Sequence, residues 1–434
     1  AGLGLNLDYD RPTMFGNLDG YLLVHDDAED QIANRRDVDH DGETRGFIQL
    51  QHRHLLRDNR ELSIEAAYVS DETFLEEFFR GEADQSKPFE TSVYVKKQEE
   101  DWAFSFLAKT DLNDFIAQTP TLQAPGYTVE KLPELGYFRV ATPLWDDRLT
   151  WYSENRFSRM RIRAGDDAPA ERGFTTAQSM LNFGIPATTT FEDAFDALGV
   201  PDDSYLRGDS RHELQAPVKL GDIDVVPFVA GRVTAYDDNF EEFSGEDDNL
   251  RLQGTAGVRT NMSISKVDDT VDIPMLDVHR IRHIVEPHAD FSITGNTVNP
   301  EDFPVFDADV EGLSEGYTIN LGVRNTWQTQ RGGPGRRRTV AWTTPDTDFI
   351  LRGDDADDTT PLPRYFGYRP EYARGGDHFH SRLLWAVSDN FAVTGDVTYD
   401  FEGSQVATWH IGGTMRHTDR LTSFIEYADI RPYV

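Results

Sequence analysis

Hydrophobic and polar residues alternate along many stretches of the chain. In residues 317–327 one face would carry Tyr317, Ile319, Leu321 and Val323, and the other would carry polar residues such as Thr318 and Asn320. Successive side chains of a β-strand point to opposite faces, so this period of two predicts strands with one apolar and one wet face. Few stretches fit the three- and four-residue spacing of an amphipathic helix.

About eighteen segments show this pattern. We predict strands near residues 2–10, 19–25, 45–56, 60–69, 89–97, 102–110, 134–144, 148–158, 211–219, 222–235, 250–265, 279–295, 316–328, 338–351, 379–386, 391–400, 404–416 and 421–430. Several reach the roughly 9–11 residues that a tilted strand needs to cross a bilayer. The pattern therefore predicts an all-β fold, a large antiparallel transmembrane β-barrel that forms one domain over residues 1–434.

The predicted connections alternate between long and short from residue 26 onward. Long acidic loops such as 26–44 and 159–210 alternate with short turns such as 57–60 and 145–147. Outer-membrane barrels have short periplasmic turns and longer outer loops. Two connections do not fit, because 266–278 should be short and 401–403 should be long. This alternation places neither end of the chain on the periplasmic side, so we expect at least one further strand at each end.

Composition narrows the function classes. The formal net charge is −35, which argues against binding to a nucleic-acid backbone, and the absence of cysteine excludes disulfides and thiolate metal sites. The sequence contains no run of about 18 apolar residues, so it predicts no membrane-spanning helix. We find no G-x-S-x-G, phosphate-loop or H-E-x-x-H motif, so we expect a protein that is not an enzyme. The first residues show no signal peptide.

Four stretches, taken in order, are similar to one known family. They are ELSIEAAYVSDETFLEEFF at 61–79, KLPELGYFRVATPLWDDRLTWYSENRFSRMR at 131–161, RIRHIVEPHADFSITG at 280–295 and GYTINLGVRNTWQTQ at 316–330. In these stretches the chain resembles the C-terminal barrel of the lipopolysaccharide-assembly outer-membrane proteins, the LptD or OstA family.

The resemblance implies export of lipopolysaccharide to the surface of a Gram-negative bacterium, with the protein in the outer membrane. It further implies periplasmic bridge proteins that deliver the glycolipid, a lipoprotein plug of the LptE type in the lumen, and release into membrane lipid between the first and last strands. The chain departs from the family pattern, because it shows no N-terminal periplasmic jellyroll, it has no cysteine, and its strand count falls short of twenty-six. We therefore assign no gate residue.

A barrel of this size is too wide for its own side chains to fill, so polar residues on the inner face could line a route for a phosphorylated sugar head group. The candidates on this face are Glu65, Glu154, Arg156, Arg324 and Asp396. The alternative for each is an ordinary solvated residue of the lumen.

One loop resembles the start of a calcium-binding loop. Asp37, Asp39 and Asp41 alternate and are followed by Gly42, as carboxylates that converge on one cation would require. The twelfth position is Ile48 instead of a glutamate, so an ordinary acidic loop is the alternative. Calcium is the only cofactor that the sequence suggests.

Two other functions remain open from the sequence. A passive outer-membrane porin would share the architecture but would have an open, conducting lumen. A secreted acidic β-protein that binds calcium or polysaccharide would not be in a membrane at all.

Overall fold

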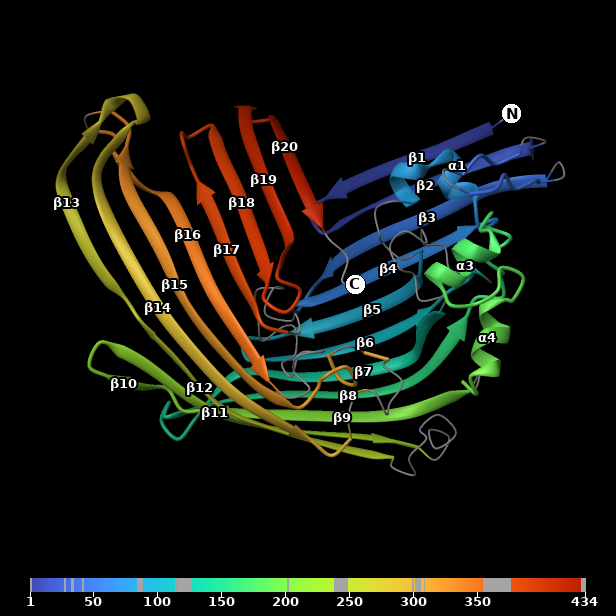
Figure 1. The fold of residues 1–434 in the computed structure, drawn as a ribbon, viewed down its shortest axis with the longest axis horizontal. Helices are drawn as coiled ribbons and strands as arrows, with labels where there is room; N and C mark the ends of the chain where they lie inside the picture. The colour runs from blue at the N-terminus through green and yellow to red at the C-terminus, as the bar shows by residue number, and fades with distance from the viewer. Residues whose placement is uncertain are drawn as a thin grey trace.

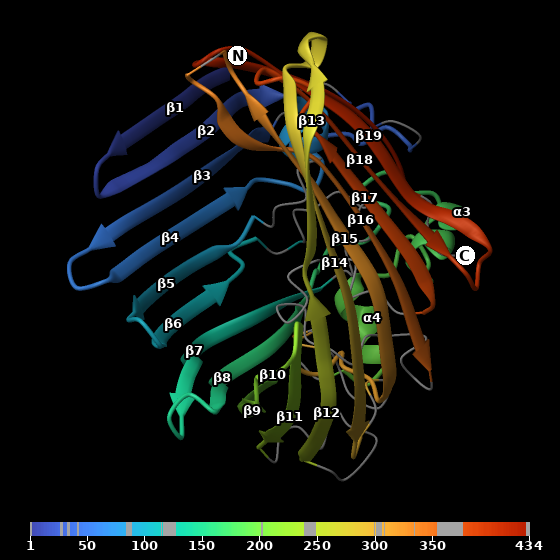
Figure 2. The same ribbon diagram turned by 90° about the vertical axis from the view of Figure 1, so that its left-hand side faces the viewer.

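A computed structural model describes most of the chain. The described residues are 2–26, 29–32, 35–40, 43–83, 89–113, 115, 127–200, 203–237, 249–298, 300, 306–307, 309–333, 335–353 and 376–430. They form a single curved wall of β-strands with short helices in the loops at one rim, as Figures 1 and 2 show from two sides.

The wall contains twenty strands. They are β1 (Gly2–Arg11), β2 (Met14–Asp26), β3 (Glu43–Leu56), β4 (Arg60–Val69), β5 (Thr91–Gln98), β6 (Trp102–Thr110), β7 (Tyr127–Leu144), β8 (Leu149–Ala164), β9 (Ser204–Gln215), β10 (Val218–Leu220), β11 (Ile223–Tyr236), β12 (Leu250–Met262), β13 (Ile264–Ile273), β14 (Val278–Asn296), β15 (Gly316–Arg331), β16 (Arg338–Gly353), β17 (His378–Trp385), β18 (Phe391–Asp400), β19 (Gln405–Thr418) and β20 (Leu421–Ile430). The helices are α1 (Phe74–Phe78), α2 (Arg80–Ala83), α3 (Thr176–Asn182), α4 (Phe191–Ala197) and the 3₁₀ helix η3 (Pro274–Leu276).

Neighbouring strands pair antiparallel in chain order, and two strands are interrupted. β9 and β10 both pair with β11, and β12 and β13 both pair with β14, so each of these pairs acts as one broken strand. If each broken strand is counted once, the described wall has eighteen strands. This arrangement confirms the predicted fold class of a large antiparallel β-barrel. β14, with 19 residues, and β15, with 16, exceed the length needed to cross a bilayer.

The connection at 266–278 agrees with the alternation once its structure is known. Most of it is β13, which pairs along β14 from Ile264 opposite Val285 to Ile273 opposite Val278. Only Pro274–Asp277 remain as the turn, and this turn is short. The connection between β18 and β19 covers only residues 401–404, so it stays short where the alternation expects a long loop.

Three strands extend six or seven residues further at one end than the sequence pattern predicts. β7 begins at Tyr127 instead of 134, β8 ends at Ala164 instead of 158, and β9 begins at Ser204 instead of 211. These extensions lie at the rim, where the prediction had loops at 111–133 and 159–210. Their backbone groups pair with neighbouring strands there, for example Arg161 of β8 with Ser204 of β9. Cross-strand hydrogen bonding thus extends these strands beyond the part whose sequence alternates between apolar and polar residues.

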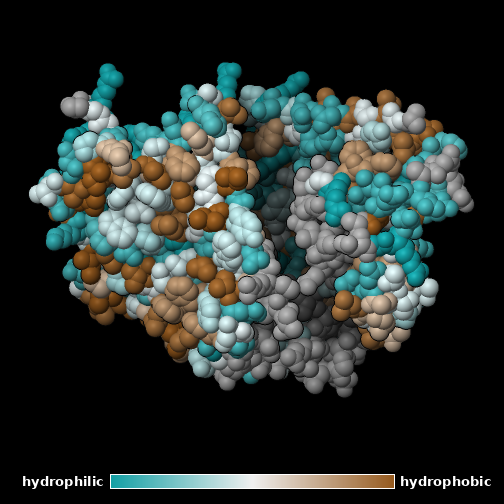
Figure 3. Space-filling view, turned by 45° about the horizontal axis from the view of Figure 1, so that its top comes forward, coloured by the Kyte–Doolittle hydropathy of each residue, from teal (hydrophilic) through white to brown (hydrophobic). Residues whose placement is uncertain are grey.

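The wall is apolar outside and polar inside. In β15, Tyr317, Leu321 and Val323 are exposed, while Thr318 and Asn320 on the opposite face are buried. This is the reverse of a soluble protein, and it suits a wall whose outer face contacts hydrocarbon. Figure 3 shows apolar patches on the outer surface and a hollow in the middle of the face that it presents.

The described parts of the long loops after β2, β4 and β8 contact one another at the rim that carries α1, α3 and α4 in Figure 1. A small apolar cluster supports this rim at the end of β4, with Val69, Phe74, Leu75, Phe89 and Phe115 among its buried members. Of the helices in the described part of the chain, none has both the length and the apolar character that a membrane crossing requires.

Candidate functional site

The inner face of β9 carries a row of buried charges. Four alternate residues, Arg207, Asp209, Arg211 and Glu213, are at most 5% exposed, whereas Leu206 and Leu214, which flank them in the strand, are 40% and 38% exposed. The period-two geometry of the strand turns every second side chain inward. The signs of the charges alternate along the strand, so each cation has a carboxylate beside it.

The charges pair with one another and with the neighbouring strands. The guanidinium of Arg232, on β11, donates from Nε and Nη2 to both carboxylate oxygens of Asp209, at 2.9 and 3.0 Å. Arg211 donates to Glu213 at 2.6 Å. Buried charges are tolerated only with such partners, because removal from water costs each ion several kcal/mol. The row is therefore a fixed, internally neutralised part of the wall.

A loop folds onto this row from inside the barrel. We call the described residues 306–307 and 309–315 the inner loop. Its Glu311 accepts hydrogen bonds from Nη1 of Arg207 at 2.6 Å and from the hydroxyl of Tyr236 at 2.7 Å. Its backbone accepts from Arg232 at the carbonyl of Asp309, at 2.6 Å. Val310 and Leu313 are buried, so the loop is packed against the wall as well as paired to it.

Asp307 is the second anchor of the inner loop. Its carboxylate accepts from Arg207 at 2.5 Å and from Nζ of Lys131, on β7, at 2.8 Å. Burial by itself would raise the pKa of Asp307, but Arg207 and Lys131 outweigh burial and hold the pKa well below its usual range. Asp307 is therefore charged at every physiological pH.

All five residues predicted to line the lumen lie on the inner face. Glu154 and Arg156 of β8 are 3.6 Å apart, and Glu154 lies 4.0 Å from Arg211, so the structure brings these two into the charged row. The other three are separate. Arg324 of β15 faces Asp346 across the strand pair at 3.8 Å, Asp396 of β18 pairs with His410 of β19, and Glu65 lies on β4 on the face that Val69 shares. Their role in transport stays a prediction.

The sequence pattern missed the most buried charges. Arg207 and Asp209 fell in the predicted loop 159–210, because the outward residues beside them include Gly208 and Ser210 and leave no apolar alternation. The alternating signs of 207, 209, 211 and 213 were the available signal. No local signal marks Glu311, since its partners lie on distant strands.

The structure describes only two of the three predicted calcium ligands. Asp37 and Asp39 are exposed, and Asp41 lies outside the part of the chain that the structure describes. A different group, Asp30, His40 and Asp71, brings its ligand atoms within 4.8 Å of one another. Calcium at the predicted loop stays a prediction.

A guanidinium already neutralises that second group. Arg45 donates to Asp30 at 2.6 and 2.8 Å, to Asp71 at 2.8 Å and to Asp26 at 2.8 Å. The side chain of Arg45 is almost completely buried at this point. A fixed arginine thus stands where a metal ion would otherwise bind.

Comparison with known proteins shows that this chain matches the model of one protein family. The family model described as LPS transport system D matches residues 43–427. Among curated proteins, no relative matches. Several solved structures match, among them the FrpB iron transporter from Neisseria meningitidis (F3-3 variant), with 10% sequence identity and a TM-score of 0.31 over 99% of this chain and 79% of that one.

Proposed function

The chain belongs to the LPS transport system D family, LptD, and from this premise we propose that its barrel is the translocon through which lipopolysaccharide crosses the outer membrane. Members of this family act in lipopolysaccharide transport and assembly, and they reside in the bacterial outer membrane. Lipopolysaccharide is accordingly the substrate, and the partners belong to the same transport pathway. A secreted acidic protein would not fit this location.

The inner face carries the proposal. Lipopolysaccharide has a phosphorylated head group, and arginine binds phosphate with paired, charge-assisted hydrogen bonds. The side chains of Arg156 and Arg324 are 19% and 34% exposed, so they remain accessible from the lumen. Arg207 and Arg232, in contrast, are covered by the inner loop. We therefore assign the accessible pair to head-group contact and the covered pair to wall structure.

Release into the membrane is the second part of the proposal. Among the described strands, β1 and β20 each pair with only one neighbour, β2 and β19 respectively. Both are highly exposed, with Leu3 of β1 and Ile425 of β20 at 73% and 80%. Acyl chains would leave sideways between the first and last strands of the complete barrel, beyond β1 and β20 where further strands are expected, while the head group stays on the polar inner face. A lipoprotein plug of the LptE type would fill the wide lumen, and periplasmic bridge proteins would load it.

The accessible arginines provide the test. Cells that depend on a full-length copy of the protein would carry either Arg156→Glu with Arg324→Glu, or the matched control Arg156→Lys with Arg324→Lys. We expect the reversed charges to reduce lipopolysaccharide at the cell surface, because phosphates are repelled, and the lysine pair to retain most delivery. The readout is surface-labelled lipopolysaccharide at equal barrel abundance. Unchanged delivery by the glutamate pair would remove both residues from the route.

Conductance distinguishes the translocon from a passive porin. A porin would conduct ions steadily in planar bilayers without any partner. We expect the purified barrel with its plug to show little steady conductance, because the plug and the inner loop occupy the lumen. High conductance that is insensitive to the plug would favour the porin.

A further inference from the structure

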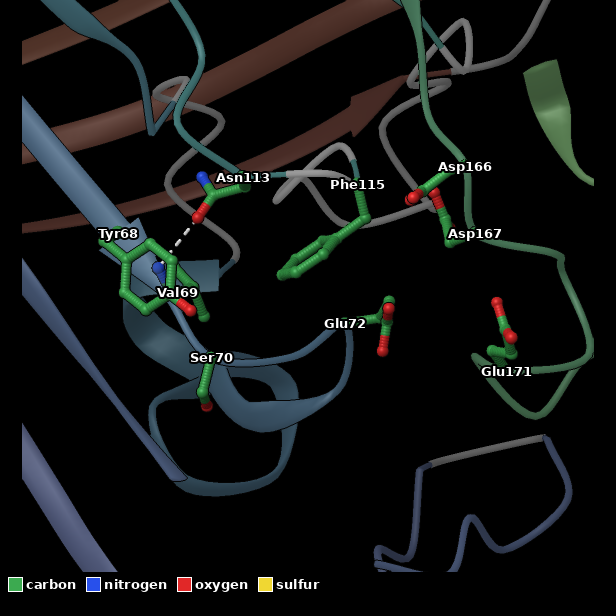
Figure 4. Close-up of a pocket in the computed structure, with 9 residues that line it drawn as sticks. All are labelled: Tyr68, Val69, Ser70, Glu72, Asn113, Phe115, Asp166, Asp167 and Glu171. Carbon is green, nitrogen blue, oxygen red and sulfur yellow. Dashed lines mark hydrogen bonds between the residues drawn. The ribbon is translucent and has the colours of Figure 1, made fainter. Parts of the chain in front are cut away.

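A cavity of about 320 Å³ lies where three rim loops meet. Its walls come from the segment after β4, the segment after β6 and the segment between β8 and α3. Figure 4 shows the arrangement, with four carboxyl groups on one side of the cavity and Tyr68, Val69 and Asn113 on the other. The four acidic residues are Glu72, Asp166, Asp167 and Glu171.

These carboxylates outnumber the cations near them. Arg172 donates from Nε to Oδ2 of Asp167 at 2.7 Å. Among the described residues, no ion pair neutralises Glu72, Asp166 or Glu171. Burial raises the pKa of Glu72 above its usual value, and the nearby charge of Arg172 offsets this effect only in part. The cavity thus combines negative charge with incomplete compensation.

Asp167 points independently to a missing ligand. The residue is only 2% exposed, yet among the residues that the structure describes its second carboxylate oxygen, Oδ1, has no hydrogen-bond partner. A buried, unsatisfied oxygen of a charged group costs on the order of 1–3 kcal/mol or more, and native proteins rarely retain one. Since Asp167 lines the cavity, a cation there would satisfy this oxygen.

We propose that the cavity binds a divalent cation, Mg²⁺ or Ca²⁺, which keeps part of its water shell. Both ions prefer carboxylate and amide oxygens, and Mg²⁺ in particular retains several waters and uses only one or two carboxylates. Six waters occupy about 180 Å³ at roughly 30 Å³ each, so a hydrated ion fits the space. The four carboxylates share one side of the cavity, but among the described residues no three of them bring their ligand atoms within 4.8 Å of one another, which favours contact through water.

The bound ion would join loops that are distant in sequence. Glu72 follows β4, while Asp167 and Glu171 follow β8, and other contacts already hold these loops together. Arg35, in the loop after β2, bridges them, because it forms an ion pair with Glu76 of α1 and donates from Nη1 to the carbonyl of Arg172 at 2.9 Å. A divalent cation would neutralise the excess charge at this junction and so stabilise the rim. This site is separate from the transport route and does not depend on the proposed function.

Calorimetric titration of the full chain in detergent tests the site. CaCl₂ and MgCl₂ would be titrated into wild type, into Glu72→Gln with Asp167→Asn, and into the control Asp37→Asn with Asp39→Asn, each against NaCl at equal ionic strength. We expect saturable binding to wild type and to the control, and at least a tenfold loss of affinity in the first variant. The amide substitutions keep the size of both side chains.

Three results would overturn the proposal. They are no saturable divalent binding to wild type, equal binding in the Glu72→Gln/Asp167→Asn variant, and loss of binding in the Asp37→Asn/Asp39→Asn control alone. If the double variant does not fold, Glu72→Gln by itself decides the question. Glu72 has no ion pair to lose, so its substitution should weaken cation binding without unfolding the rim, and unchanged affinity would contradict the site.

Discussion

Arg207 of β9 and Glu311 of the inner loop are both completely buried, and their side chains meet at 2.6 Å although 104 residues separate them in the chain. Glu311 also accepts the hydroxyl hydrogen of Tyr236. This pair fastens the inner loop to the barrel wall. Because both charges are removed from water, each depends on the other for compensation.

Replacing Glu311 with alanine should release the inner loop. Arg207 would still pair with Asp307 but would lose Glu311, the more buried of its two carboxylate partners. Breaking a buried ion pair typically destabilises a protein by about 3–5 kcal/mol. We expect residues 306–315 to become sensitive to protease and the thermal unfolding temperature in detergent to fall. Glu192→Ala, at an exposed position of α4, is the control and should change neither. Equal protection of the loop in both variants would show that packing of Val310 and Leu313 holds it without the ion pair.

A charge on the outer face should be costly only where that face contacts lipid. Val229 lies in the middle of β11 and is 57% exposed, while Leu181 of α3 is 84% exposed in a rim loop. We expect Val229→Lys to destabilise the barrel by about 2–4 kcal/mol near the bilayer midplane, and Leu181→Lys to change stability by less than about 0.5 kcal/mol. Denaturant unfolding in lipid vesicles measures both. Similar costs would contradict the membrane orientation of the wall.

The rim around His40 should depend on pH in two directions. His40 lies 3.2 Å from Asp30, in a group that also contains Arg45, Asp71 and Thr73. The hydrogen bond with Asp30 raises the pKa of His40 and outweighs burial. Its stabilisation is therefore complete below the ordinary histidine pKa of about 6.5 and is lost as pH rises through the raised value.

Asp30 accounts for the loss of rim stability in the opposite direction, as pH falls. Burial would raise the pKa of Asp30, but His40, Arg45 and Thr73 outweigh it and lower the pKa. Its contribution is present above the ordinary aspartate pKa and is lost as pH falls through the lowered value. We expect protection from hydrogen exchange at residues 29–40, taken relative to the intrinsic exchange rate at each pH, to be greatest near pH 5–6, and His40→Asn to abolish its decline on the alkaline side. An unchanged alkaline decline in that variant would assign it to another group.

Some strands were fully predictable, and the reason is local. The predicted ranges 60–69, 102–110, 391–400 and 421–430 coincide with β4, β6, β18 and β20. In each of these strands, at least two apolar residues share one face, and polar residues occupy the other face. β13 was missed because Asp269 lies between Val267 and Val271 on one face and interrupts the apolar pattern, while Lys266, Asp268 and Asp272 on the other face are polar. Only its hydrogen bonds to β14 make it a strand.

Within the strands that it predicts, the sequence by itself determined which side chains face lipid and which face the lumen, because that choice follows from the two-residue period of each strand. The inward orientation of Glu154, Arg156 and Arg324 needed nothing more. Only the tertiary structure decided which charges meet. The approach of Glu311 to Arg207, and of Glu72 to Asp167, depends on the path of the whole wall and on how its loops fold back, and no local pattern encodes a contact across a hundred residues.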